Sequence, residues 1–124
     1  MPKSVANIVL DSALNYIRNN ATQECLCSAE PTTFAQATTA YKLGIKTGLT
    51  SASFSTPTDG ETSGRQITVN QESAIDVDIT GWAGHVALCS GSALLYVTTI
   101  ETQAVTSGNL CTIQPWEITI LDPV

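Results

Sequence analysis

The chain has 124 residues, of which 43% are apolar and only 13% are charged, and its formal net charge is −6. This length corresponds to one domain that can bury a core without the help of a metal. The acidic balance argues against nucleic-acid binding through counterion release and against adsorption to an anionic membrane. With 18 Thr and 11 Ser residues, the polar surface is mainly hydroxyl. Thr, Val and Ile favour pleated, half-buried surfaces, so we expect a β-rich body that packs against other protein.

The start of the chain carries no pattern typical of a targeting segment. Met1 to Ser4 lead into a stretch interrupted by Asn7 and Asp11, whereas a signal peptide needs an uninterrupted apolar region. No run reaches the roughly 18 apolar residues that span a membrane. We therefore expect a protein that is kept in a cytoplasm, or assembled there into a larger particle.

Residues 4–19 are predicted to form the only substantial helix. Ser4 is a candidate N-cap, and Asn19 and Asn20 suit a left-handed ending. Apolar and small side chains recur at intervals of three and four, which places these residues on one stripe: Val5, Ile8, Val9, Ser12, Ala13 and Tyr16 or Ile17. The stripe either plugs the open end of a sheet or docks on a partner, and we expect most of it to do the former.

The rest of the chain has the pattern of short strands separated by turns. Residues 32–39 allow one or two helical turns, residues 56–64 have the strongest loop pattern, and residues 103–109 form a second loop. Strands are expected at 23–28, 67–69, 75–79, 85–89, 94–100 and 110–121, with 41–45 and 52–55 as strands or extended loop. Pro115 cannot donate a ladder hydrogen bond, so the last strand must lie at an edge or carry a bulge.

These elements predict a mainly β fold. Six or seven short strands, one N-terminal α-helix and no βαβ alternation favour an antiparallel β-sandwich or a small open barrel. No internal repeat or linker divides the sequence. We expect a single β-rich domain over 1–124, with the helix at about 4–19 and the β-body at about 23–122.

No catalytic constellation is visible, and we expect the protein not to be an enzyme. The one histidine, His85, begins an apolar strand, and no nucleophile signature accompanies it. Asp76 and Asp78 would project from one face of a strand, but calcium needs more oxygen ligands and a glycosidase needs a second carboxylate across a cleft. Gly60 and Gly64 lack the lysine and hydroxyl of a phosphate loop. We therefore assign no catalytic, cofactor or metal site.

Four cysteines, Cys25, Cys27, Cys89 and Cys111, are the most informative chemistry in the sequence. The Cys-x-Cys spacing differs from that of the usual zinc-binding pairs. On a strand, Cys25 and Cys27 would lie about 6.5 Å apart on one face, too far for a comfortable disulfide with each other. All four are candidates for cross-linking after assembly, within the chain or between subunits. Cys89 and Cys111 are also consistent with ordinary buried thiols.

A hairpin, a loop and a final strand recur together in the second half of the chain. The hairpin contains His85-Val-Ala-Leu88, a short turn and Leu94-Leu95, the loop is Val105-Thr-Ser-Gly-Asn109, and the strand alternates from Ile113 to Ile120. This combination resembles a group of small virion structural proteins of tailed bacteriophages, described as head decoration or tail-fibre-like proteins. The segments 10–17 and 27–33 also resemble members of this group. The motifs contain no catalytic signature.

The resemblance implies a β-sandwich subunit that attaches to the major capsid protein or to other virion proteins and associates as an oligomer, with a trimer favoured. The first hypothesis is a capsid decoration, or minor capsid, protein that stabilises the head. The second is a neck, collar or tail-appendage subunit. The third is a carbohydrate-binding β-domain that uses Trp82 or Trp116. Tyr41 and Tyr96 join these two tryptophans as aromatic candidates for contacts.

Overall fold

A computed structural model describes residues 4–122 of the chain, which contain nine strands and one α-helix. Residues 1–3 and 123–124 lie outside the described part. The expectation about a targeting segment rests partly on residues 1–3, so it lies partly outside the described residues. The elements in chain order are α1 (Asn7–Asn20), β1 (Gln23–Cys27), the π-helical η1 (Gln36–Ala40), β2 (Lys42–Thr47), the 3₁₀-helical η2 (Ser51–Ser53), β3 (Thr58–Asp59), β4 (Arg65–Val69), β5 (Glu72–Val77), β6 (Gly81–Cys89), β7 (Leu94–Val105), β8 (Leu110–Ile113) and β9 (Trp116–Ile120).

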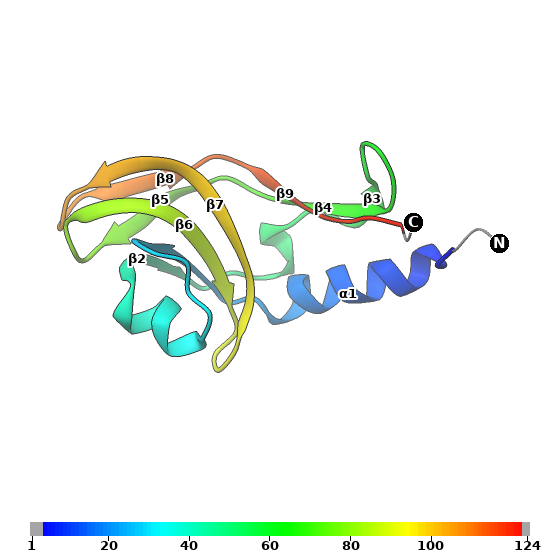
Figure 1. The fold of residues 1–124 in the computed structure, drawn as a ribbon, viewed down its shortest axis with the longest axis horizontal. Coiled ribbons are helices and arrows are strands. Elements are labelled where there is room, and N and C mark those ends of the chain that lie inside the picture. Colours follow the sequence, from blue (N-terminus) through cyan, green and yellow to red (C-terminus); the bar gives the residue numbers. More distant parts are fainter. Residues whose placement is uncertain (1–3, 123–124) are drawn as a thin grey trace.

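The strands form two antiparallel sheets, one large and one small. The large sheet has the order β7-β6-β1-β2-β5-β8, and the small sheet has the order β3-β4-β9. The large sheet is strongly curled, so that it makes a half-barrel, and α1 runs beneath the small sheet (Figure 1). The predicted fold class, mainly β with one N-terminal helix, is confirmed, and the open-barrel alternative describes the large sheet best.

The last predicted strand, 110–121, is wrong as a single element. β8 pairs with β5 in the large sheet, whereas β9 pairs with β4 in the small one. Gln114 and Pro115 connect the two strands, so the proline lies where the chain leaves one sheet for the other. Both strands are edges of their sheets, as the missing proline donor required.

The predicted helix exists, but its ends and its buried side differ from the prediction. It begins at Asn7 after Ala6, which makes no side-chain cap, so Ser4 is not the N-cap. Its last residue, Asn20, is followed by extended Ala21, and no described non-glycine residue has a positive φ. The asparagines therefore do not provide a left-handed ending.

Most of the predicted stripe of α1 faces solvent instead of plugging the sheet, and only Ile17, the alternative to Tyr16 at its end, packs against the core. Ile8 and Tyr16 are 74% and 60% exposed, and Val9 is exposed as well. The buried side chains of the helix are Leu10 and Leu14, which lie on the opposite side. Leu14 packs in a cluster with Leu49 and Phe54 and with residues of both sheets, which are Ile67, Val69, Leu88 and Ile118. The burial of a leucine pair four residues apart thus decides the helix orientation.

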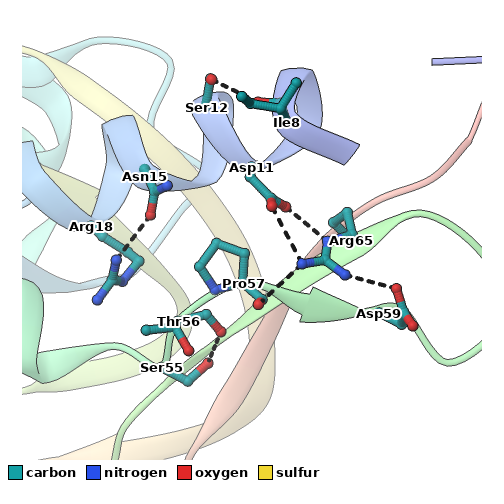
Figure 2. Close-up of polar contacts among 10 residues, drawn as sticks. All are labelled: Ile8, Asp11, Ser12, Asn15, Arg18, Ser55, Thr56, Pro57, Asp59 and Arg65. Atoms are coloured by element: carbon teal, nitrogen blue, oxygen red, sulfur yellow. Dashed lines mark hydrogen bonds and ion pairs between the residues drawn. The ribbon is translucent and has the colours of Figure 1, made fainter. Parts of the chain in front are cut away.

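A three-way ion pair fixes α1 to the small sheet (Figure 2). Arg65 at the start of β4 donates from Nε to Asp11 Oδ1 at 2.8 Å, and from Nη1 to Asp59 Oδ1 of β3 at 2.7 Å. Its Nη2 also reaches Asp11 Oδ2 and the carbonyl oxygen of Pro57. The preceding Gly64 has φ +74, and its backbone lies against that of Ile120, where a side chain would not fit. This turn places the guanidinium of Arg65 against α1.

The two faces of the large sheet bury different material. On the concave face, a cluster contains Leu26, Leu43, Ile75, Val77, Ala83, Val86, Val105, Cys111 and Ile113. On the other face, Cys25, Cys27 and Cys89 pack with Ala37 and Ala87. The helical segment 34–40 supplies Ala37, and it covers this second face (Figure 1, cyan). The expectation of one or two helical turns in 32–39 is therefore confirmed, with the helical segment at 34–40.

Smaller differences concern strand limits. Residues 51–53 form a 3₁₀ turn, and only Phe54 of the predicted 52–55 strand makes a bridge, to Val69. β6 begins at residue 81 instead of 85, and β7 extends to 105, so the second loop shortens to 106–109. None of the helices in residues 4–122 has the length and apolar character that a membrane crossing requires.

Candidate functional site

A surface depression lies between β7 and β8, the two edges of the half-barrel. A groove of about 490 Å³ is lined by residues 100–103 of β7 and by residues 112–116, which run from β8 into β9. A second depression of about 330 Å³ adjoins it, lined mainly by residues 103–106 and 109–112. The two depressions share Gln103 and Thr112. Together they follow the open side of the curled sheet.

A buried carboxylate lies behind this groove. Glu24 of β1 is 1% exposed, and no other charged side chain in residues 4–122 is buried to this degree. Its Oε1 accepts a hydrogen bond from Nε1 of Trp116 at 3.3 Å, and its Oε2 has no partner. The pKa of Glu24 is raised to about 7, mainly because burial desolvates the carboxylate. The hydrogen bond from Trp116 opposes this rise, and the Glu72 carboxylate adds to it. Near neutral pH this site therefore holds or releases a proton.

Trp116 connects the groove with the interior. Its ring stacks on that of Tyr96, with 5.9 Å between ring centroids and 27° between the planes. The half-buried indole packs against both the concave cluster and the cluster that contains Leu14. Trp116 thus lines part of the groove, while its Nε1 donates to Glu24 in the interior. Sequence reasoning named both aromatic residues as contact candidates, and both take part in the packing.

Three of the four cysteines form a closed thiol layer. The interaction of the Cys25 and Cys89 side chains, followed by burial, holds the pKa of Cys25 far above its ordinary value. The same interaction lowers the pKa of Cys89, against the effect of burial. Burial raises the pKa of Cys27 to about 12, and its Sγ donates to the carbonyl oxygen of Ala37 at 3.6 Å. Protonated thiols in an apolar layer pack as small hydrophobic groups.

All four cysteines are buried, and none is in a disulfide. Cys111 lies apart from the other three, in the concave cluster, where its Sγ accepts a weak hydrogen bond from Gln103 Nε2 at 3.7 Å. In the chain as folded, no thiol is presented to a neighbouring molecule. Cross-linking between subunits stays a prediction that would require β1, β6 or β8 to open.

The remaining candidates of the sequence do not come together. His85 lies opposite Cys27 and Thr99 in the ladders, and its Nδ1 is buried without a hydrogen-bond partner. Asp76 is exposed on β5, and Asp78 follows the strand and pairs with Lys42 at 3.0 Å. Within residues 4–122, no group of three or more His, Cys, Asp or Glu side chains is placed to hold a metal ion.

The predicted contact aromatics divide into one exposed and three packed residues. Trp82 is 66% exposed on β6. Tyr41 packs at the margin of the thiol layer, and Tyr96 and Trp116 pack together as described above. Sequence reasoning did not single out Glu24. A signal was present, because Glu24 alternates with the two cysteines on a strand and so shares the face of Leu26.

Comparisons with protein-family models, with curated proteins and with solved structures find no match for this chain. Its function must therefore be argued from its own residues.

Proposed function

We propose that this protein is a non-enzymatic structural subunit that associates with copies of itself through the outer face of α1. The observation that carries this proposal is the chemistry of that face. Its exposed side chains are large and apolar or small and uncharged: Asn7, Ile8, Val9, Ser12, Ala13, Tyr16 and Asn19. An unpartnered apolar helix face is typical of a surface that another protein covers.

Charge explains why a second copy suits this face. The chain has a net charge of −6, so most of its surface repels an identical surface. The Asp11 carboxylate of α1 is bound by Arg65 of β4 and so points inward (Figure 2). Arg18 donates to Asn15 within the helix. The outward face is left without a charged side chain. The small residues Ser12 and Ala13 allow two helices to approach closely.

A more specific version places the subunit in the virion of a tailed bacteriophage, as a head decoration protein. Support for it comes from the motifs around His85, Gly108 and Pro115 and from the low charge. A neck, collar or tail-appendage subunit is the alternative within the virion, and the aromatic side chain of Trp82 keeps a carbohydrate-binding domain as the alternative outside it. Quantitative mass spectrometry of purified particles separates these functions. A copy number near that of the major capsid protein supports decoration, and a copy number of about a dozen supports the neck. Absence of the protein from particles overturns the virion assignment.

Sedimentation equilibrium tests the self-association directly. We expect the wild-type chain to form an oligomer and Ile8→Glu to shift it to monomer, because the new carboxylate would be buried against its symmetry mate. Ile8 is exposed, so the free energy of unfolding should change by less than about 0.5 kcal/mol. Ile79→Glu is the matched control, since Ile79 is an exposed isoleucine away from α1. A monomeric wild-type chain, or dissociation by Ile79→Glu alone, contradicts the proposal.

A further inference from the structure

The half-barrel is open along one line, between β7 and β8. β7 is hydrogen-bonded to β6 and β8 to β5, and among the described residues neither edge has a second neighbour. An edge strand carries a row of backbone donors and acceptors that another extended chain can pair with. The groove and its adjoining depression run along both of these edges.

The size of this opening matches an extended peptide. The wall on the β7 side runs from residue 100 in β7 to residue 106 just beyond it, which corresponds to about 20 Å at a rise of ~3.3 Å per residue. A strand of six or so residues would fill that length. Its alternate side chains would point toward the concave cluster, where Ile100 and Trp116 already lie half-buried.

The charge around the opening favours a basic occupant. Glu101 is exposed on the β7 wall, and Glu72 lies opposite Ile113 of the other wall. Glu24 lies behind Trp116. No residue of either lining is basic, and the described cations Arg18, Lys42, Lys46 and Arg65 belong to α1, β2 and β4.

We infer that the groove between β7 and β8 receives an extended segment of a partner polypeptide that carries a Lys or Arg side chain. The segment adds a strand to the open edge of the half-barrel, and its basic side chain pairs with Glu101. This mode of recognition takes affinity from backbone hydrogen bonds and specificity from alternate side chains. The site is independent of the α1 face, so Ile8→Glu should retain it.

The test uses a designed probe, an acetylated and amidated hexapeptide that alternates valine and lysine. The chain has two tryptophans, so Trp82→Phe leaves Trp116 as the fluorescent reporter in the groove. We expect a saturable change in Trp116 emission. We also expect backbone amide shifts in residues 100–103 and 112–114 on the same titration. Both signals should persist in the Ile8→Glu variant.

Two control peptides and two variants make the result specific. A peptide with every backbone amide nitrogen methylated should not bind, because it has no N–H group left to donate to either edge of the opening. Glu101→Lys should raise the Kd about tenfold, because the lysine of the peptide would meet a positive instead of a negative side chain on the β7 wall. Glu61→Lys, the same charge change in the β3–β4 loop, should leave the Kd within about twofold, since exposed charges at that distance are screened. Absence of saturation at millimolar peptide, equal binding of the N-methylated peptide, or an unchanged Kd in Glu101→Lys would each overturn the inference.

Discussion

The two faces of β1 bury ionisable groups with opposite consequences. Cys25 and Cys27 point into the thiol layer, and Glu24, which precedes Cys25, points to the concave side. Desolvation raises the pKa on both sides. A thiol is already neutral at pH 7, so a further rise changes nothing at that pH. The pKa of the carboxyl moves into the neutral range, so its burial makes the stability of the fold depend on pH.

The two faces of β1 also differ in how completely other residues cover them. Ala37 and the rest of the 34–40 segment cover the thiols, and the Cys27 thiol finds an acceptor there. On the concave side, Glu24 has a partner for one oxygen and none for the other, and the groove lies beyond Trp116. A partly satisfied buried polar group is costly and points to a function or a pH response.

The largest change in the free energy of unfolding is expected when a carboxylate is introduced into the thiol layer. Ala87 is fully buried opposite Cys25. Ala87→Asp should lower the free energy of unfolding at pH 8 by about 3–5 kcal/mol, because no group in the layer compensates the charge. Ala87→Asn has the same bulk and should cost less at pH 8, and the two variants should converge near pH 4. Urea unfolding at both pH values measures this. Equal losses at pH 8 would mean that bulk, not charge, limits this layer.

A smaller effect is expected from removing the carboxylate on the concave side. Between pH 4.5 and pH 7 the folded chain keeps a proton on Glu24 that the unfolded chain releases, so the free energy of unfolding falls as the pH rises. The total fall is about 3 kcal/mol or somewhat less, given the ordinary factor of 1.36 kcal/mol per pKa unit. Glu24→Gln keeps an acceptor for Trp116 and should stabilise the fold at pH 8 but not at pH 4. A variant with an unchanged pH slope would show that Glu24 is ionised throughout.

The smallest effect is expected at Cys111, the thiol of the concave cluster. Its Sγ accepts from Gln103 and donates to the carbonyl oxygen of Thr112, and a serine hydroxyl can do both. Cys111→Ser should therefore change the free energy of unfolding by about 1 kcal/mol or less. In the wild-type chain at pH 8, a thiol-specific reagent should label none of the four cysteines rapidly until denaturant is added, because all four are buried. Rapid labelling of the native chain would place a thiol at the surface and favour cross-linking between subunits.

The sequence predicted the elements that depend on local pattern. The strand at 23–27, the turns at 34–40 and the edge position required by Pro115 all follow from short-range rules about alternation, turn residues and missing donors. The same rules failed at α1. Ile8, Val9 and Tyr16 form as regular an apolar stripe as Leu10 and Leu14, and periodicity alone cannot say which of two stripes a sheet will cover.

The candidate site depended on contacts that no local pattern contains. Trp116 and Glu24 are 92 positions apart in the chain, and the groove exists because two edge strands of one curled sheet approach each other. The composition by itself determined a weakly charged, β-rich body rich in hydroxyl groups, because β-branched residues favour strands wherever they occur. Only the tertiary structure decided which face of α1 is left exposed and which carboxylate is buried. Both depend on which surfaces meet when the two sheets and the helix pack together.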